Sequence, residues 1–204
     1  MAQFIVFEGP DGSGKSTQIR LLYTYLRDEL KKMVVETREP GGTEIGQEIR
    51  EILLNPNNVE MRDITEVLLY ASSRAQHVGQ LIKPCLEAGK TVLCDRFVDS
   101  SIAYQGYGRG IDLNLVKEIN RFAMQGIEPD LGIYIMVRPE IALERIAKKR
   151  NLDRLEKETI DFHQRLYEGY KELIEEADYK HWINGEESIE KIHYNVKRLV
   201  KKHI

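Results

Sequence analysis

Apolar residues along this chain occur in two patterns, as short continuous runs and as residues spaced three or four positions apart. The continuous runs predict buried strands, because a strand that is covered on both faces has no polar side. These runs are Gln3–Glu8, Met33–Thr37, Thr91–Asp95, Leu131–Val137 and Tyr179–Ile183. The pattern therefore predicts a parallel sheet of about five strands.

The spaced apolar residues predict helices between these strands. Helical spacing is found at Ile19–Leu30, Ile45–Leu53, Arg62–Leu86, Ile141–Ile146, Phe162–Leu173 and Ile189–Leu199. Because strands alternate with helices, the predicted fold class is three-layer α/β, with helices on both faces of the sheet. A chain of 204 residues can bury one sizeable core, and we expect one domain spanning residues 1–204.

Composition and charge narrow the class of protein. Hydrophobic residues make up 42% and charged residues 31%, and repeats are absent, which argues against a disordered or solenoid protein. The formal net charge of -3 argues against an extended nucleic-acid surface. The sequence has no signal-peptide pattern and no run of roughly 18 apolar residues, so we expect a cytoplasmic protein without a membrane partner.

A glycine-rich stretch, GPDGSGKST, lies between the first predicted strand and the first predicted helix. It fits the pattern Gly-x-x-x-x-Gly-Lys-[Ser/Thr] of a P-loop, in which backbone N–H groups surround a phosphate. Lys15 would bridge the β- and γ-phosphates of ATP, and the Ser16 hydroxyl would be a ligand of Mg²⁺. The predicted nucleotide-binding residues are Gly9, Pro10, Asp11, Gly12, Ser13, Gly14, Lys15, Ser16 and Thr17.

The P-loop alone leaves three classes of protein open, because GTPase switches, ATPase motors and small-molecule kinases all contain one. The guanine-reading motif Asn-Lys-x-Asp does not occur in the sequence, which argues against a GTPase. A motor would usually have a further domain, and little of the chain is left to form one. A compact kinase that uses ATP and Mg²⁺ fits best.

Polar residues at the ends of later strands indicate where a second substrate would bind, since ligands of such folds lie at the carboxyl ends of the strands. Asp95 is placed to orient Mg²⁺ or to anchor the loop, and Arg96 can contact two phosphate oxygens with its guanidinium. Arg38 ends the second strand beside two glycines and is another candidate for a phosphate contact. For each of them the alternative is an exposed charge in a turn.

Two further segments could hold a base. Tyr70 and Arg74 lie four positions apart on the long helix, so the ring could stack on a base while the guanidinium bonds its edge. Ser101, Tyr104 and Gln105 belong to SSIAYQGYGRG, which is polar and flexible enough to wrap around a ligand. A core tyrosine and an ordinary surface loop are the alternatives.

Basic residues are dense between residues 145 and 156. Phosphoryl transfer spreads negative charge over the transferred group, and an arginine that arrives on closure can stabilise that charge. Because the glycine loop has no arginine, we predict a lid at about residues 145–156 in which Arg150 or Arg154 is catalytic. A solvated helix is the alternative.

The sequence resembles the thymidylate kinase family over nearly all of its length. The resemblance rests on FEGPDGSGKST, TREPGGT, LLYASSRAQHV, LCDRFVDSSIAYQ and the basic stretch before DRLE, in this order. LCDRFVDSSIAYQ looks like the family's signature and is far more specific than the P-loop. The resemblance implies a P-loop kinase fold, a homodimer, and transfer of the γ-phosphoryl group of ATP to dTMP in dTTP synthesis.

The resemblance also implies roles for single residues. Arg38 and Arg96 would hold the monophosphate, Tyr70 would stack on thymine, Arg74 would bond its O4, and Tyr104 would crowd a ribose 2′-hydroxyl. By position in the motifs, the substrate-binding residues would be Asp11, Arg38, Tyr70, Arg74, Arg96, Ser101, Tyr104 and Gln105, and the catalytic ones Asp11, Lys15, Arg96, Arg150 and Arg154. The loop without arginine resembles the bacterial type, whose catalytic arginine lies in the lid.

Two other functions stay open at this point. Another nucleotide or nucleoside kinase would share the P-loop, although a nucleoside acceptor would leave Arg38 and Arg96 without a phosphate partner. A nucleotide-dependent switch would bind ATP and change shape without phosphorylating a small molecule.

Overall fold

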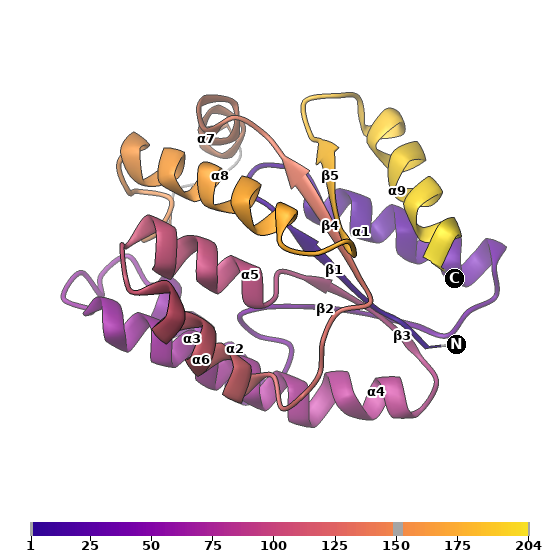
Figure 1. Ribbon diagram of the computed structural model, residues 1–204, viewed down its shortest axis with the longest axis horizontal. Coiled ribbons are helices and arrows are strands. Elements are labelled where there is room, and N and C mark those ends of the chain that lie inside the picture. The colour runs from indigo at the N-terminus through magenta and orange to yellow at the C-terminus, as the bar shows by residue number, and fades with distance from the viewer. Residues whose placement is uncertain (1, 149–152, 204) are drawn as a thin grey trace.

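The computed structural model of the protein describes residues 2–148 and 153–203. Over these residues, five parallel strands form one sheet in the order β2-β3-β1-β4-β5 (Figure 1). The strands are β1 (Phe4–Glu8), β2 (Val34–Arg38), β3 (Thr91–Asp95), β4 (Leu131–Met136) and β5 (Lys180–Asn184). The predicted α/β class and the parallel sheet of about five strands are confirmed.

Helices cover both faces of this sheet (Figure 1). They are α1 (Lys15–Thr24), α2 (Glu44–Leu54), α3 (Asp63–His77), α4 (Lys83–Glu87), α5 (Val98–Ser101), α6 (Leu113–Ala123), α7 (Pro139–Ala147), α8 (Ile160–Glu175) and α9 (Ile189–His203). Three π-helical segments continue α1, α3 and α5, namely η1 (Tyr25–Glu29), η2 (Val78–Ile82) and η3 (Ile102–Gly108). Among the described residues, no helix combines the length and apolarity needed to cross a bilayer.

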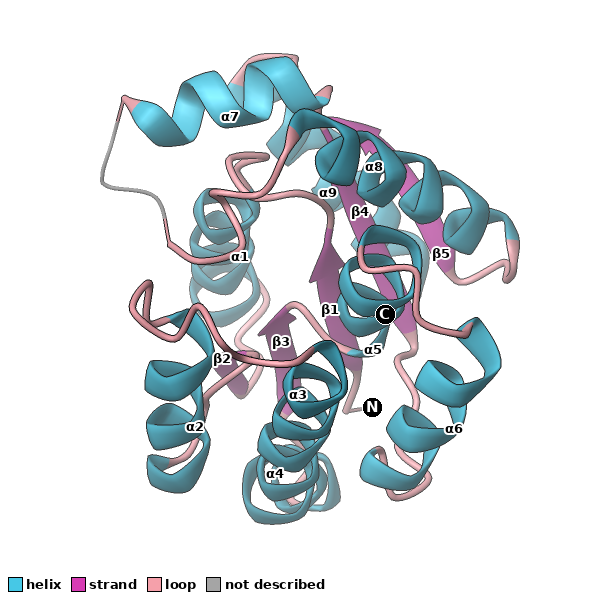
Figure 2. Cartoon of the chain, turned by 90° about the vertical axis from the view of Figure 1, so that its left-hand side faces the viewer, coloured by secondary structure: helices cyan, strands magenta, loops and turns pink. Residues whose placement is uncertain are grey.

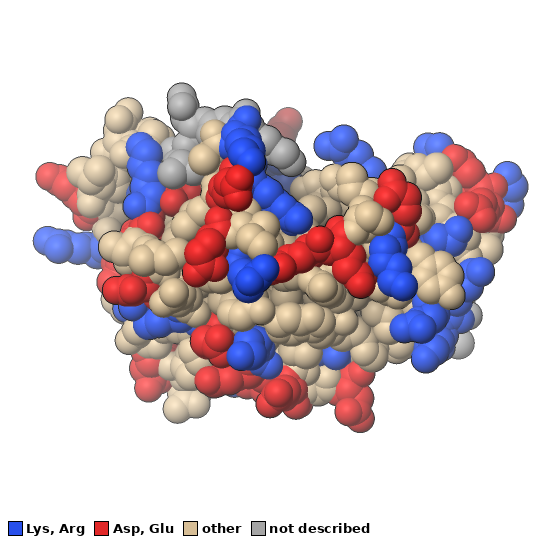
Figure 3. All heavy atoms as spheres, turned by 90° about the horizontal axis from the view of Figure 1, so that it is seen from above, with Lys and Arg blue, Asp and Glu red and all other residues tan. Residues whose placement is uncertain are grey.

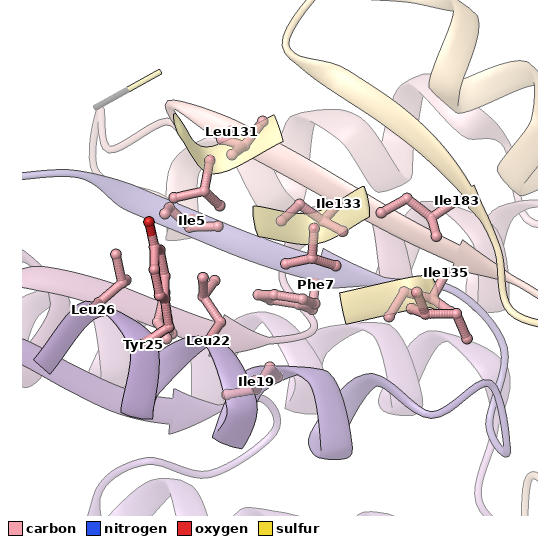
Figure 4. Packing of buried hydrophobic residues seen from close by; sticks show 14 residues of the cluster. Ile5, Phe7, Ile19, Leu22, Tyr25, Leu26, Leu131, Ile133, Ile135 and Ile183 are labelled. Atoms are coloured by element: carbon pink, nitrogen blue, oxygen red, sulfur yellow. The ribbon is translucent and has the colours of Figure 1, made fainter. Parts of the chain in front are cut away.

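The three central strands, β1, β3 and β4, bury side chains on both faces of the sheet, which is why their apolar runs form strands. Ile5 and Phe7 of β1 belong to the cluster that packs against α1 and α9, and Figure 4 shows them facing α1. Phe4 and Val6 point to the other face, where η2 covers them. All four are at most 2% exposed, and burial of such a side chain stabilises the fold by about 1.5–3 kcal/mol. The P-loop therefore starts from a strand that is fixed on both sides.

The helix predicted over Arg62–Leu86 is confirmed as the continuous series α3, η2 and α4. The segment after β3 differs from the surface-loop alternative, because α5 and η3 form a helix whose Ser101, Tyr104 and Gln105 are at most 6% exposed. This segment is buried because it packs against α8. The glycines that suggested flexibility instead permit this packing, since a Cβ on Gly108 would lie 2.6 Å from the ring of Phe162.

Helix α6 has no counterpart among the sequence predictions. Its apolar residues recur three or four positions apart, and its most buried face includes the polar residue Asn120 beside Val116 and Ala123. The reason for this placement is tertiary, because the amide oxygen of Asn120 accepts a hydrogen bond from Arg74 of α3.

Strand register gathers the predicted polar residues at one edge of the sheet. Arg38 pairs with Asp95, Asp95 pairs with Phe7, and Glu8 pairs with Tyr134. The arrowheads of β1 and β3 point toward the side on which α7 lies (Figure 2). The carboxyl ends of three strands therefore meet where the fold class predicts a ligand.

Candidate active site

A cavity of about 340 Å³ lies at this carboxyl edge. That volume falls in the range of small-molecule sites. Its walls come from the P-loop, the end of β2, α2, α3, the α5–η3 segment and α7. The lining includes Asp11, Gly12, Gly14, Lys15, Ser16, Thr17, Arg38, Glu39, Arg50, Tyr70, Arg74, Asp95, Arg96, Ser101, Tyr104, Gln105 and Arg145.

The P-loop takes its shape from glycines with positive φ. Gly9, Gly12 and Gly14 have φ of 125°, 75° and 96°, a region that other residues adopt only with strain. A Cβ on Gly9 would lie 2.2 Å from the carbonyl oxygen of Ile135, so this position also has no room for a side chain. Helix α1 begins at Lys15 directly after the loop, and its N-terminus adds a positive dipole. The loop is thus built to surround an anion.

Lys15 lies inside this loop and is 6% exposed. Its Nζ donates hydrogen bonds to the carbonyl oxygens of Gly9 at 3.0 Å and Pro10 at 2.8 Å. Burial, followed by the positive charge of Arg96, lowers the pKa of the Lys15 ammonium to about 8, although nearby carboxylates oppose this shift. Lys15 therefore remains mainly protonated at neutral pH, ready to contact a phosphate.

Ser16 and Asp95 meet at the mouth of the P-loop. The Ser16 Oγ donates a hydrogen bond to Asp95 Oδ2 at 2.8 Å. A hydroxyl and a carboxylate are hard oxygen donors, which Mg²⁺ prefers, and Mg²⁺ is commonly held by one or two protein groups together with substrate phosphates. The pair therefore fits the predicted metal ligands.

Arg96 forms the centre of a polar cluster beneath the cavity. Its backbone φ of 70° is unusual for a residue with a side chain, and such strain is concentrated at functional sites. One guanidinium nitrogen donates to Asp11 Oδ1 at 2.7 Å and to the Tyr104 hydroxyl at 3.0 Å. The Tyr104 hydroxyl in turn donates to Asp11 Oδ2 at 2.8 Å. The charges of Arg96 and Lys15 outweigh the effect of burial and hold the pKa of the Asp11 carboxyl below its ordinary value.

Glu8 supports Arg96 from below and was not among the residues predicted from the sequence. The other guanidinium nitrogen of Arg96 donates to Ser100 Oγ at 3.0 Å and to the Tyr170 hydroxyl at 3.1 Å. Both hydroxyls bond the fully buried Glu8, at 2.5 Å and 3.2 Å. Burial and the negative charge of Asp99 raise the pKa of Glu8 to about 7, against the opposing effect of the Ser100 hydrogen bond.

The predicted base-binding residues line the wall opposite the P-loop. Arg74 is 1% exposed, and its nitrogens donate to Glu39 Oε2 at 2.8 Å and Ser101 Oγ at 3.1 Å. Gln105 donates through Nε2 to Glu66, whereas its buried Oε1 has no hydrogen-bond partner among the described residues. Gln105 is one of the residues that line the cavity.

Tyr70, Arg38 and Arg50 complete the cavity wall. The ring of Tyr70 is half-buried beside Arg74, so the helical spacing brought them to one face as predicted. Arg38 is exposed and has no ion pair to another described residue, which leaves its guanidinium available. Arg50 of α2 was not predicted, because only the packing of α2 brings it to the cavity. Burial and the positive charge of Arg38 lower the pKa of Arg50, as expected where two cations lie close together.

The basic segment after β4 is only partly described. Arg150 lies outside the described residues. Arg154 forms an ion pair with Glu66 at 2.5 Å and donates to the carbonyl oxygen of Leu53 at 2.9 Å. Arg145, in the same segment, donates to the carbonyl oxygens of Gly185 at 2.9 Å and Gly12 at 3.5 Å, so it contacts the P-loop. It belongs to the predicted basic stretch but was not chosen as catalytic.

Comparisons with known proteins agree with this arrangement. A match to the family described as thymidylate kinase covers residues 7–196. The chain belongs to the thymidylate kinase family. The thymidylate kinase of Thermoanaerobacter sp. (strain X514) is 48% identical over 99% of this chain and 98% of its own length. That of Trichodesmium erythraeum (strain IMS101) is 42% identical over 100% of this chain and 97% of its own.

A crystal structure of thymidylate kinase from Ehrlichia chaffeensis has a TM-score of 0.79 and 33% identity, and covers 98% of both chains. The structure of this thymidylate kinase family member is thus a P-loop kinase fold. Sequence reasoning gave no role to Glu8, Arg50, Arg145 or Tyr170. Glu8 lies in FEGPDGSGKST at the carboxyl end of the first strand, and Arg145 lies in the basic stretch, whereas Arg50 and Tyr170 belong to none of the motifs.

Proposed function

We infer that this protein is an enzyme that phosphorylates dTMP to dTDP with ATP and Mg²⁺. The observation that carries this inference is the cavity in which the P-loop, with its Asp11, faces Arg96 and Tyr104, in a chain whose relatives are named thymidylate kinases. A P-loop alone would suit many nucleotide-binding proteins. A second site with arginines for a phosphate and a buried wall for a base is what a nucleotide kinase needs.

The proposed reaction requires positioning and charge stabilisation more than acid–base chemistry. The atom of dTMP that would accept the phosphoryl group is a phosphate oxygen. It is already anionic, so no side chain has to remove a proton from it. Arg38 and Arg96 would hold this phosphate, and the hydrogen bonds that Arg96 donates to Asp11 and Tyr104 keep its guanidinium in place. Lys15 would stabilise the negative charge of the transferred group.

Ser16 and Asp95 would hold the Mg²⁺ ion. Bound there, Mg²⁺ would neutralise charge on the phosphate oxygens of ATP. The two side chains lie at the N-terminus of α1, next to the loop that would surround those phosphates. Their hydrogen bond keeps both oxygens on the same side of the cavity.

We also propose that the catalytic arginine comes from the lid, at about residues 145–156, as in the bacterial type. The P-loop sequence has no arginine, and Arg145 already lies against Gly12. Arg154 would have to leave Glu66 before it could reach the transferred group. In alanine variants, loss of the catalytic arginine should lower kcat by about a thousandfold. A change of less than about tenfold in both Arg150→Ala and Arg154→Ala would contradict this assignment.

The function is tested by ADP release with Mg-ATP and a panel of dTMP, dUMP, UMP, CMP, AMP, GMP and thymidine. We expect strong turnover with dTMP and weaker turnover with dUMP, because one methyl group is worth only about 1–3 kcal/mol in a pocket. Mass spectrometry should find dTDP. Turnover of thymidine that persists in Arg96→Ala would indicate a nucleoside kinase, and ADP with free phosphate alone would indicate a switch or an ATPase.

We propose in addition that two copies of the chain form a dimer through α2, α3 and α6. These helices lie side by side, since α3 contacts both α2 and α6. Large apolar side chains that are at least 42% exposed occur on each of them, namely Ile45, Ile52, Ile64, Leu68, Leu115 and Phe122. A surface of this kind on three neighbouring helices is typical of an interface between proteins. The cytoplasmic location stays a prediction from the sequence.

A further inference from the structure

A buried histidine lies behind the cavity wall, and the mechanism described above does not use it. His77 is the last residue of α3 and is 0% exposed. Its Nδ1 lies 3.0 Å from Glu39 Oε1, and its Nε2 lies 2.7 Å from Thr37 Oγ1. Because a carboxylate only accepts hydrogen bonds, Nδ1 carries a hydrogen and donates to Glu39. Both ring nitrogens are therefore occupied by the same short loop.

The loop comprises residues 37–42, of which the first two are the end of β2, and it is shaped around the imidazole. Gly42 has a φ of 77°, and a Cβ at this position would lie 2.4 Å from the His77 ring. One turn earlier on α3, Ser73 Oγ accepts a hydrogen bond from the backbone N–H of Gly41 at 3.1 Å. His77 and Ser73 thus hold the loop against α3 from two sides.

The loop is also the support of Arg74. The two oxygens of the Glu39 carboxylate are divided between His77 and Arg74, whose Nε lies 2.8 Å from Oε2. The remaining Arg74 nitrogens donate to Ser101, Asn120 and the carbonyl oxygen of Phe97. Of the five N–H groups of an arginine, these contacts with described residues occupy four, which leaves one.

The same loop contains Arg38, which stands between the two residues that His77 holds. Arg38 and Arg74 both line the cavity, and the proposed function gives them the phosphate and the base of one dTMP molecule. A shift of the loop by a fraction of an ångström would move both contacts at once. Displacement by about 1 Å can lower the rate by about a hundredfold, even when it arises far from the reacting atoms.

We propose that His77 is a positioning residue for dTMP. Through Glu39 it fixes the guanidinium of Arg74, and through Thr37 and Glu39 together it fixes the loop that carries Arg38. The single remaining N–H of Arg74 suits an acceptor such as the base O4, whereas the 4-amino group of dCMP would place a donor against it. This role rests on the proposed function and extends it to a residue outside the cavity.

Two substitutions separate the two bonds of the ring. His77→Asn keeps an amide N–H near the position of Nδ1, whereas His77→Gln keeps an acceptor near Nε2 and loses the bond to Glu39. For His77→Gln we expect the KM for dTMP to rise about tenfold, which is the loss of about one hydrogen bond to a charged group. The KM for ATP should stay unchanged, and the preference for dTMP over dCMP in kcat/KM should fall.

His77→Asn should raise the KM for dTMP by less than about threefold, since it retains the bond to Glu39. Thr37→Val removes only the Nε2 partner and keeps the bond to Glu39, so it tests the second bond and should raise the KM for dTMP less than His77→Gln does. His193→Gln, on the half-buried surface of α9, is the control for loss of a histidine elsewhere and should change neither KM.

Three results would overturn the positioning role. They are an unchanged dTMP KM in His77→Gln, an equal rise in the KM of ATP and dTMP, and an effect in His77→Asn as large as in His77→Gln. The second of these is what a general loss of structure would produce. Absence of dTMP turnover by the wild-type protein would contradict the proposed function itself. This failure is distinguished from failure of the His77 proposal because the wild type alone shows it.

Discussion

At the scale of single residues, the site depends on how buried charges are paired. Arg96 has an unusual backbone conformation, and its guanidinium contacts Asp11 and Tyr104 above and Ser100 and Tyr170 below. A buried cation without such partners would cost several kcal/mol. Glu8, which lies beneath Arg96, is fully buried, and burial disfavours its ionised form and so raises its pKa.

Glu8 should make the stability of the protein depend on pH. Its carboxyl titrates near 4.5 in the unfolded chain and at about 7 in the folded protein. Between these values the folded protein holds a proton that the unfolded chain has released, so its contribution to stability is complete below pH 4.5 and lost as the pH rises through 7. Glu8→Gln removes this titration.

We therefore expect the free energy of unfolding of the wild type to fall between pH 5 and pH 8 by on the order of 2–3 kcal/mol more than that of Glu8→Gln. Urea unfolding of both proteins at several pH values measures the difference. Glu118→Gln, on the exposed face of α6, should follow the wild type. Parallel curves for the wild type and Glu8→Gln would show that folding does not raise the pKa of Glu8.

At the scale of elements, the P-loop and α7 are in close contact. Gly12 has a φ of 75°, and a Cβ there would lie 2.6 Å from the carbonyl oxygen of Ala142 in α7. Arg145 of α7 reaches back to the carbonyl oxygen of Gly12. The position of the helix at the start of the predicted lid is therefore coupled to the shape of the phosphate loop.

Gly12→Ala should disturb both elements. Strain from the positive φ costs about 1–2 kcal/mol, and the clash with a helix carbonyl adds to it because backbone cannot rotate away. Gly89→Ala is the matched control, since Gly89 has a φ of 76° but no atom within 4 Å of its Cβ position. We expect Gly12→Ala to unfold at lower urea concentration than Gly89→Ala and to have a raised KM for ATP. Equal stability of the two variants would contradict the contact with α7.

At the scale of the whole molecule, charge and apolar surface are distributed differently. On the face that Figure 3 shows, acidic and basic side chains are interspersed. The apolar residues of α2, α3 and α6 are instead grouped on neighbouring helices. These helices also carry Arg50, Tyr70 and Arg74, so that a dimer through their outer faces would hold the substrate wall in place.

Leu68→Arg should weaken this dimer. Leu68 is 49% exposed on α3, and a charge buried at its position in an interface would be unpaired. Size-exclusion chromatography with light scattering should find twice the mass of one chain for the wild type and a shift toward one chain for the variant. Tyr194→Arg, which replaces a residue 61% exposed on α9, is the control and should remain dimeric. A wild type with the mass of one chain would contradict the proposed interface.

Local features of the chain were sufficient to predict much of this protein. The five strands and the continuous helix from α3 to α4 follow from hydrophobic spacing, which acts over a few residues. The same holds for the P-loop, since its glycines, Lys15 and Ser16 are adjacent in the sequence. Tyr70 and Arg74 reached one cavity wall because the helical repeat alone places them on one face.

What only the tertiary structure decided is the set of contacts between distant segments. Glu8 accepts a hydrogen bond from Ser100, which lies 92 positions away in the chain. Gly12 accepts one from Arg145, which lies 133 positions away. The burial of Tyr104 likewise depends on α8, and the role we propose for His77 depends on Glu39. Propensity and periodicity describe how a segment folds, whereas the pKa and the hydrogen-bond partners of a side chain depend on which other segments pack around it.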